Sequence, residues 1–195
     1  ETALNGAPKK LIDLPPAGNH WMRNLVLSAD GAKLYVAVGS ASNIAEKGFE
    51  IEKGRAAIWE LDLKSGRARQ FAQGLRNANG LDWNPSTGEL WTVVNERDML
   101  GPDLVPDYLT NVPVGAHYGW PWIYWKKYDD DRVGGQPPEF SWDNQCCHGA
   151  IAKLSAGFGP HPQGAMIGGI ENLMGSHAAI SLSKLVDAAN TGSAC

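Results

Sequence analysis

Leu25-Val-Leu-Ser-Ala-Asp-Gly-Ala-Lys-Leu-Tyr-Val36 and Leu81-Asp-Trp-Asn-Pro-Ser-Thr-Gly-Glu-Leu-Trp-Thr92 are two copies of one pattern, offset by 56 residues from position 25 to position 81. In each copy alternating apolar residues lead into a polar turn that contains a glycine, and a second alternating run follows. Alternation with period two indicates a strand, and two strands around such a turn indicate a β-hairpin.

A further hairpin is predicted between the copies, from 57–63 through Lys64-Ser-Gly66 to 67–72. Two hairpins in each repeat make four antiparallel strands in roughly 50 residues, which is typical of a β-propeller blade. A plain β-sandwich also has short, evenly spaced strands. The matched apolar and aromatic positions favour an all-β propeller of four-stranded antiparallel blades. Because propellers close with about 4–8 blades, 195 residues are expected to form only part of one.

The composition changes after Trp142. All eight Trp lie at or before this position, whereas only five charged residues follow it. We therefore expect a partial propeller over 1–142 and a divergent tail rich in Gly, Ala and Ser over 143–195.

Charge and hydropathy exclude two classes of partner. The net charge is -4 and the basic residues form no long run, which argues against a nucleic-acid surface. No apolar stretch is long enough to span a membrane. The first residues do not have the pattern of a signal peptide. We therefore expect either a cytoplasmic protein or a mature or partial form of a longer one. The absence of an initial Met favours the mature or partial form.

Three polar segments precede or follow the predicted strands: 18–24, 75–80 and 94–103. Loops at one end of a propeller converge on its central channel, where ligands bind. In these segments His20 has the chemistry of a general base or of an ordinary hydrogen-bonding residue. Arg76 suits a carboxylate or is a solvated turn residue. The acidic third segment suits calcium or is simply solvated.

Six motifs in order resemble the glucose/sorbosone dehydrogenase family, most closely its sorbosone dehydrogenase branch, from about Leu11 to Tyr128. They are Gly18-Asn-His-Trp-Met-Arg-Asn24, Ser28-Ala-Asp-Gly-Ala-Lys-Leu-Tyr-Val-Ala-Val-Gly39, Gly74-Leu-Arg-Asn77, Leu90-Trp-Thr-Val-Val-Asn-Glu-Arg-Asp98, Pro106-Asp-Tyr-Leu-Thr110 and Tyr118-Gly-Trp-Pro121.

The resemblance implies a six-bladed propeller that carries pyrroloquinoline quinone and calcium and oxidises an aldose or related sugar at its anomeric hydroxyl. It implies that His20 is the general base and that Arg76, Asn77 and Asn95 contact the quinone. It also implies that the loop containing the metal-site residues Glu96 and Arg97 holds calcium, largely through backbone carbonyls.

Two departures from the family pattern keep other functions open. Glu96-Arg97 stands where the glucose-oxidising branch has Gly-Pro, and the later cationic quinone-binding segments have no match in this sequence. A non-catalytic sugar- or protein-binding propeller module and an inactive fragment of the dehydrogenase therefore remain alternatives. The family further implies a periplasmic or secreted protein.

Overall fold

The computed structural model describes residues 6–100, 105, 107–124, 128–130 and 151–153. Within this part the chain is all-β apart from one short 3-10 helix, η1, at Glu50–Glu52. The strands are β1 Leu25–Leu27, β2 Lys33–Val38, β3 Ala57–Asp62, β4 Ala68–Gln73, β5 Asn77–Trp83, β6 Leu90–Asn95, β7 Tyr108–Asn111, β8 Ile123–Tyr124, β9 Tyr128–Asp129 and β10 Ile151–Lys153.

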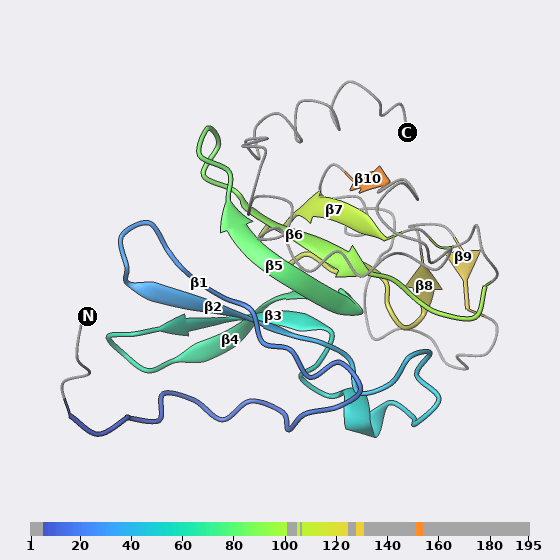
Figure 1. Ribbon diagram of the computed structural model, residues 1–195, viewed down its shortest axis with the longest axis horizontal. Coiled ribbons are helices and arrows are strands. Elements are labelled where there is room, and N and C mark those ends of the chain that lie inside the picture. The colour runs from blue at the N-terminus through green and yellow to red at the C-terminus, as the bar shows by residue number, and fades with distance from the viewer. Residues whose placement is uncertain (1–5, 101–104, 106, 125–127, 131–150, 154–195) are drawn as a thin grey trace.

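Two four-stranded antiparallel sheets form the body of the protein, in the orders β1-β2-β3-β4 and β10-β7-β6-β5 (Figure 1). They are two blades of a β-propeller, so the predicted fold class is confirmed. The second blade takes its last strand, β10, from within 143–195, and the rest of that segment lies outside the described residues. The boundary at 142 therefore stays a prediction.

The repeat that predicted the fold corresponds to the β1–β2 and β5–β6 hairpins. Leu27 pairs with Leu34 in the first hairpin, and Trp83 pairs with Leu90 in the second. Gly31 and Gly88 each lie in the turn of their hairpin, with φ of 67° and 70°. This left-handed conformation strains a residue that has a Cβ, so glycine is the residue that the two turns require.

The core lies between the two blades. Tyr35 of β2 makes edge-to-face contacts with Phe71 of its own sheet and with Trp83 of the other, at centroid distances of 5.0 and 5.2 Å. The Trp83 indole also donates a 2.6 Å hydrogen bond to the Leu27 carbonyl. These contacts join the sheets through apolar burial and a satisfied indole N–H, which fixes one blade against the next.

The candidate site lies where strand ends of both blades meet. β2 ends at Val38 and β6 at Asn95, while β5 begins at Asn77. Ser40 just beyond β2 donates its N–H to the Arg76 carbonyl at 2.8 Å, which joins the ends of the two blades. Among the described residues no helix has the length and apolar character needed to cross a membrane.

Candidate functional site

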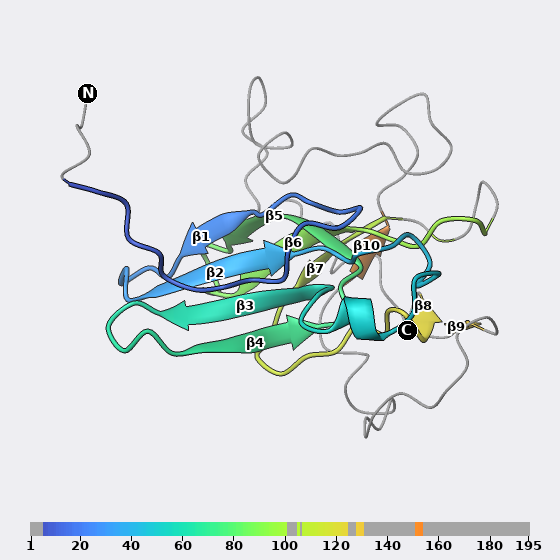
Figure 2. The ribbon, with the colours of Figure 1, turned by 90° about the horizontal axis from the view of Figure 1, so that it is seen from below.

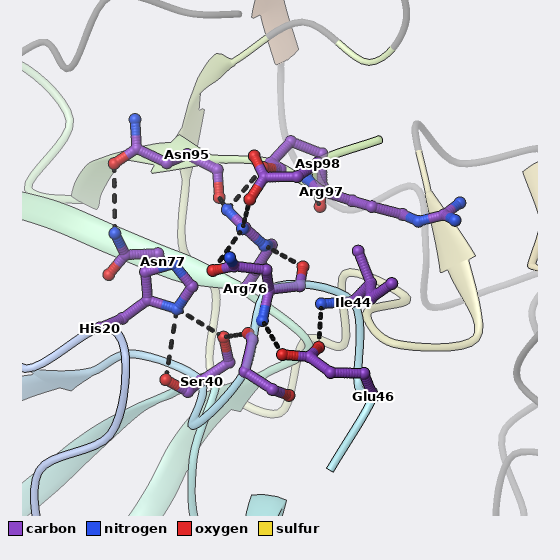
Figure 3. Close-up of polar contacts among 12 residues, drawn as sticks. His20, Ser40, Ile44, Glu46, Arg76, Asn77, Asn95, Arg97 and Asp98 are labelled. Carbon is purple, nitrogen blue, oxygen red and sulfur yellow. Dashed lines mark hydrogen bonds and ion pairs between the residues drawn. The ribbon is translucent and has the colours of Figure 1, made fainter. Parts of the chain in front are cut away.

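His20 is held against the end of β2 by its backbone and its side chain. Its N–H donates to the Ser40 carbonyl at 3.3 Å. Its Nδ1 lies 2.7 Å from Ser40 Oγ and 3.2 Å from the Ser40 carbonyl oxygen (Figure 3). Ser40 is fully buried, so its position, and with it that of the imidazole, is fixed by the blade.

The Ser40 contacts determine the tautomer of His20. The Ser40 hydroxyl donates its proton to the Ser42 carbonyl at 2.7 Å, and a carbonyl oxygen can only accept. Nδ1 must therefore carry the proton, which leaves the lone pair of the neutral ring on Nε2. Burial, and then the positive charge of Arg76, lower the pKa of His20 to about 4. At neutral pH His20 is an uncharged base.

Gly39 permits the close approach of His20 to β5. A Cβ at position 39 would lie 2.5 Å from the His20 Cβ and 2.6 Å from the Asn77 side-chain oxygen. Any larger residue would separate the two side chains. The absence of a side chain at this position therefore brings the predicted base beside one predicted quinone contact.

Arg76 is buried, with 2% of its surface exposed, and all five of its N–H donors point at protein oxygens. Nε donates to the Asn43 carbonyl at 2.8 Å, and Nη1 donates to the Asn95 and Glu96 carbonyls at 3.3 and 2.6 Å. Nη2 donates to the Asn43 side chain at 3.5 Å and to Asp98 at 2.8 Å. Arg76 thus ties the start of β5 to the loops after β2 and β6.

Asn95 is the centre of an amide cluster on the second blade. Its side-chain oxygen accepts from the amides of Asn77 and Asn79 at 3.2 and 2.6 Å. Its amide nitrogen donates to Asp107 at 2.9 Å. Asn77 and Asn79 are two apart on β5 and share a face, so strand alternation places both amides opposite Asn95. Figure 3 shows Asn77 between His20 and Asn95.

Glu96 is a buried carboxyl whose proton stays on at neutral pH. Burial raises its pKa to about 8, against the lowering effect of Arg76. Its Oε1 accepts the Arg97 backbone N–H at 2.9 Å, and Asp107 accepts the Glu96 N–H at 3.0 Å. Burial also raises the pKa of Asp107.

We expect the Glu96→Gln variant to have a higher free energy of unfolding than the wild type at alkaline pH. The native state keeps the Glu96 proton that the unfolded chain releases above about 4.5, so the wild type loses stability as the pH rises from about 4.5 to about 8. Gln preserves the shape and does not titrate. Urea unfolding should give similar stabilities at pH 5 and a more stable variant at pH 9. Parallel pH curves for the two proteins would contradict this expectation.

Arg97 does not join the His20 cluster. Its side chain points away from Arg76 (Figure 3) and forms an ion pair with Asp130 at 3.1 Å, with both side chains buried. Its guanidinium carbon lies 5.0 Å from the ring centre of Tyr124. The Arg97 side chain therefore packs against the two-stranded sheet of β8 and β9, outside the two blades.

Calcium does not fit the Asn95–Arg97 loop in this arrangement. The Asn95 and Glu96 carbonyls both accept from the Arg76 guanidinium, so a cation already occupies their acceptor side. Among the described residues there is also no cluster of three acidic, His or Cys side chains that could hold a metal. The metal roles of Glu96 and Arg97 remain untested predictions.

Sequence reasoning did not single out Ser40, Asp98 and Asp107 as individual site residues. Ser40 directs the imidazole, Asp98 pairs with Arg76, and Asp107 positions Asn95 and the Glu96 backbone. Asp98 and Asp107 fall within motifs of the resemblance, but their partners come from other strands. Ser40 had one available signal, because it directly follows the end of an apolar strand.

Comparison with known families identifies the chain. Residues 1–111 match the TrAA12-like family, a stretch that includes His20, Arg76, the asparagine cluster and Asp98. The chain belongs to the TrAA12-like family. All of the candidate site residues described above except Tyr124 and Asp130, the partners of Arg97, lie in the part that this TrAA12-like match covers.

Relatives of this TrAA12-like chain are longer proteins. An uncharacterized protein of Borreliella burgdorferi is 28% identical over 121 residues, which are 60% of this chain and 31% of that protein. A Trichoderma reesei structure of Carbohydrate-Active Enzymes Family AA12 is 25% identical, with a TM-score of 0.48, over 54% of this chain and 32% of that one. The chain thus spans about a third of the length of both.

Two further solved structures resemble this chain over comparable fractions of its length and of their own. The PQQ domain of pyranose dehydrogenase from Coprinopsis cinerea is 21% identical, with a TM-score of 0.46, over 63% of this chain and 37% of that one. The soluble aldose sugar dehydrogenase of Escherichia coli is 24% identical, with a TM-score of 0.42, over 60% and 36%.

Proposed function

We propose that this chain supplies the general base and part of the cofactor site of a pyrroloquinoline-quinone-dependent sugar dehydrogenase, of the sorbosone-dehydrogenase-like branch. The observation that carries the proposal is His20, a neutral imidazole whose Nδ1 is held by Ser40 and whose Nε2 is left as the basic atom. Two structural relatives are the PQQ domain of a pyranose dehydrogenase and a soluble aldose sugar dehydrogenase, which supports the choice of cofactor and substrate class.

His20 would take the proton of the anomeric hydroxyl through Nε2. As the imidazole becomes positively charged, its Nδ1–H stays bonded to the Ser40 carbonyl and hydroxyl, which are acceptors for the cationic ring. When bound, the quinone supplies the acceptor for the hydride that leaves the anomeric carbon. The sugar would thereby lose two electrons and two protons: one proton goes to Nε2 of His20, and the hydride, which is a proton with two electrons, goes to the quinone.

The residues present fit an anionic quinone in charge and in hydrogen-bonding chemistry. Among the charges acting on His20, the largest effect on its pKa comes from Arg76 and is that of a positive charge. A buried cation raises the affinity of a neighbouring site for an anion. Because the donors of Arg76 are taken by protein oxygens, we propose that Arg76 acts on the quinone through its charge, while Asn77 and Asn95 form the polar edge.

We expect the acidic limb of the kcat/KM profile to lie near pH 4. Only neutral His20 can accept the proton, so activity falls as the pH drops through its pKa of about 4. An ordinary histidine would lose activity near 6.5. Steady-state rates from pH 3.5 to 8 measure the limb, and a midpoint near 6.5 would show that His20 is not the buried group described.

The proposal is tested by dye reduction with the intact protein, pyrroloquinoline quinone and a panel of aldoses and related sugars. Quinone-dependent and sugar-dependent reduction supports it. Sugar binding that requires His20 but occurs without reduction would instead indicate the non-catalytic module, which the fully committed donors of Arg76 favour. Neither binding nor reduction would indicate an inactive fragment. A periplasmic or secreted location is part of the proposal and is tested by fractionating cells that express the intact protein.

A further inference from the structure

A cavity of about 340 Å³ lies beside the end of β4. It is bounded by the segment around η1, by the end of β4 and by the loop 117–122. Figure 2 shows η1 at the end of the sheet where β4 stops. A volume of this size is within the range of small-molecule sites.

One wall of the cavity is aromatic. Phe49 and Trp122 are stacked with their ring centres 5.5 Å apart and their planes 11° apart. Phe49 keeps 39% of its surface exposed. An aromatic pair at the mouth of a pocket offers an apolar surface to the C–H groups of a ligand.

The same wall also contains two buried residues, Arg55 and Trp120, which are 6% and 3% exposed. Arg55 is held in place, because its Nε donates to the Ile51 carbonyl at 2.9 Å and its Nη2 donates to the Pro16 carbonyl. Arg55 Nη1 and Trp120 Nε1 are enclosed by protein, so these two residues shape the wall and the contacts with a ligand come from other side chains.

The remaining polar groups favour an uncharged ligand. Gln70 and Gln73 of β4 line the cavity with amides that both donate and accept. Glu50 is paired with Lys53 at 2.6 Å, and the other two charged residues of the lining, Glu52 and Arg55, have opposite signs. Burial lowers the pKa of His117 to about 4, so the lining has no net charge at neutral pH. A wall with mixed donors, acceptors and an aromatic surface matches a polyhydroxy ring better than a carboxylate or a phosphate.

We infer that this cavity is a second binding site, for an uncharged monosaccharide or the terminal sugar of a glycan. It lies apart from the His20 cluster, because the lining residues belong to η1, β4 and the loop 117–122 rather than to the ends of β2, β5 and β6. The site binds sugar without quinone, and this inference does not depend on the proposed dehydrogenase activity.

One lining residue connects the cavity to the base. Glu52 accepts the Ala41 N–H at 2.8 Å and the Ser42 hydroxyl, and the Ser42 carbonyl accepts from Ser40. Variants at Glu52 would therefore disturb His20 as well. The test uses the aromatic pair and Gln70, which make no such connection in the described contacts.

Calorimetric titration of the intact, quinone-free protein with D-glucose, D-xylose and cellobiose tests the site. We expect saturable binding of at least one sugar, and about a tenfold weaker affinity in Phe49→Ala and in Trp122→Ala. Leu63→Ala is the matched control, since Leu63 is 38% exposed and lies in the turn after β3. It should bind as the wild type does.

Three results would overturn the inference. They are no saturable binding of any of the sugars, unchanged binding in Phe49→Ala, Trp122→Ala and Gln70→Ala, and loss of binding in His20→Ala, which would place the sugar at the candidate active site. Circular dichroism of each variant shows that it is folded. Failure of quinone-dependent oxidation leaves this binding unchanged, so the two proposals fail separately.

Discussion

His20→Ala lowers kcat by about 10²–10⁴-fold in the intact, quinone-loaded protein, which is the range for loss of a positioned general base. The residue supplies the basic Nε2 atom, and its Nδ1–H is already committed to Ser40. The substitution leaves Arg76, Asn77 and Asn95 unchanged, so the affinity for quinone should be retained. Steady-state kinetics and quinone titration of the same preparation measure the two quantities.

Ser40→Ala provides the companion variant for His20. It removes the hydroxyl 2.7 Å from Nδ1 and leaves the Ser40 carbonyl in place. We expect a smaller loss of kcat than in His20→Ala, with quinone affinity unchanged, because the imidazole is less firmly oriented. Wild-type kcat in His20→Ala would show that the base is another residue.

Arg76→Met lowers the free energy of unfolding by about 3 kcal/mol, the upper part of the range for leaving buried hydrogen-bond acceptors without a donor. Asp98 is 38% exposed, so loss of the ion pair itself contributes little. The variant leaves the Asn43 and Glu96 carbonyls without their donor and Asp98 without its cation. Met replaces the length of the side chain, so loss of volume is a minor contribution. Urea unfolding of both proteins at pH 7 measures the difference.

Arg69→Met is the matched control for Arg76. Arg69 also pairs with a carboxylate at 2.8 Å, but its side chain is 56% exposed and its partner, Glu60, keeps Lys33 and Tyr35. We expect a loss below about 1 kcal/mol. Equal losses in the two variants would mean that Arg76 does not hold the loops together.

The hairpins could be predicted because their signals are local. Alternation and the turn glycines Gly31 and Gly88 are sufficient to place four of the strands of the two blades. By contrast, the alternation and turn signals predict no strand at Tyr108–Asn111, where the structure has β7. It forms because it pairs with β6, from Val94 and Tyr108 to Trp91 and Asn111, and this tertiary pairing has no local signal.

For the candidate site too, the residues could be predicted from the sequence, whereas their contacts could not. The sequence identified His20, Arg76, Asn77 and Asn95, and these residues come together at the ends of β2, β5 and β6. It could not predict that Arg76 would direct every donor inward, since those acceptors are backbone carbonyls from separate loops. Nor could it predict the protonated Glu96, because a raised pKa depends on complete burial.

Anaerobic single-turnover absorbance of the quinone-loaded intact protein tests the central claim most directly. We predict that addition of the best aldose of the panel reduces one equivalent of quinone, and that the rate falls by about 10²–10⁴-fold in His20→Ala. A bound quinone that stays oxidised at saturating sugar, or one that is reduced at the same rate in His20→Ala, would contradict the account.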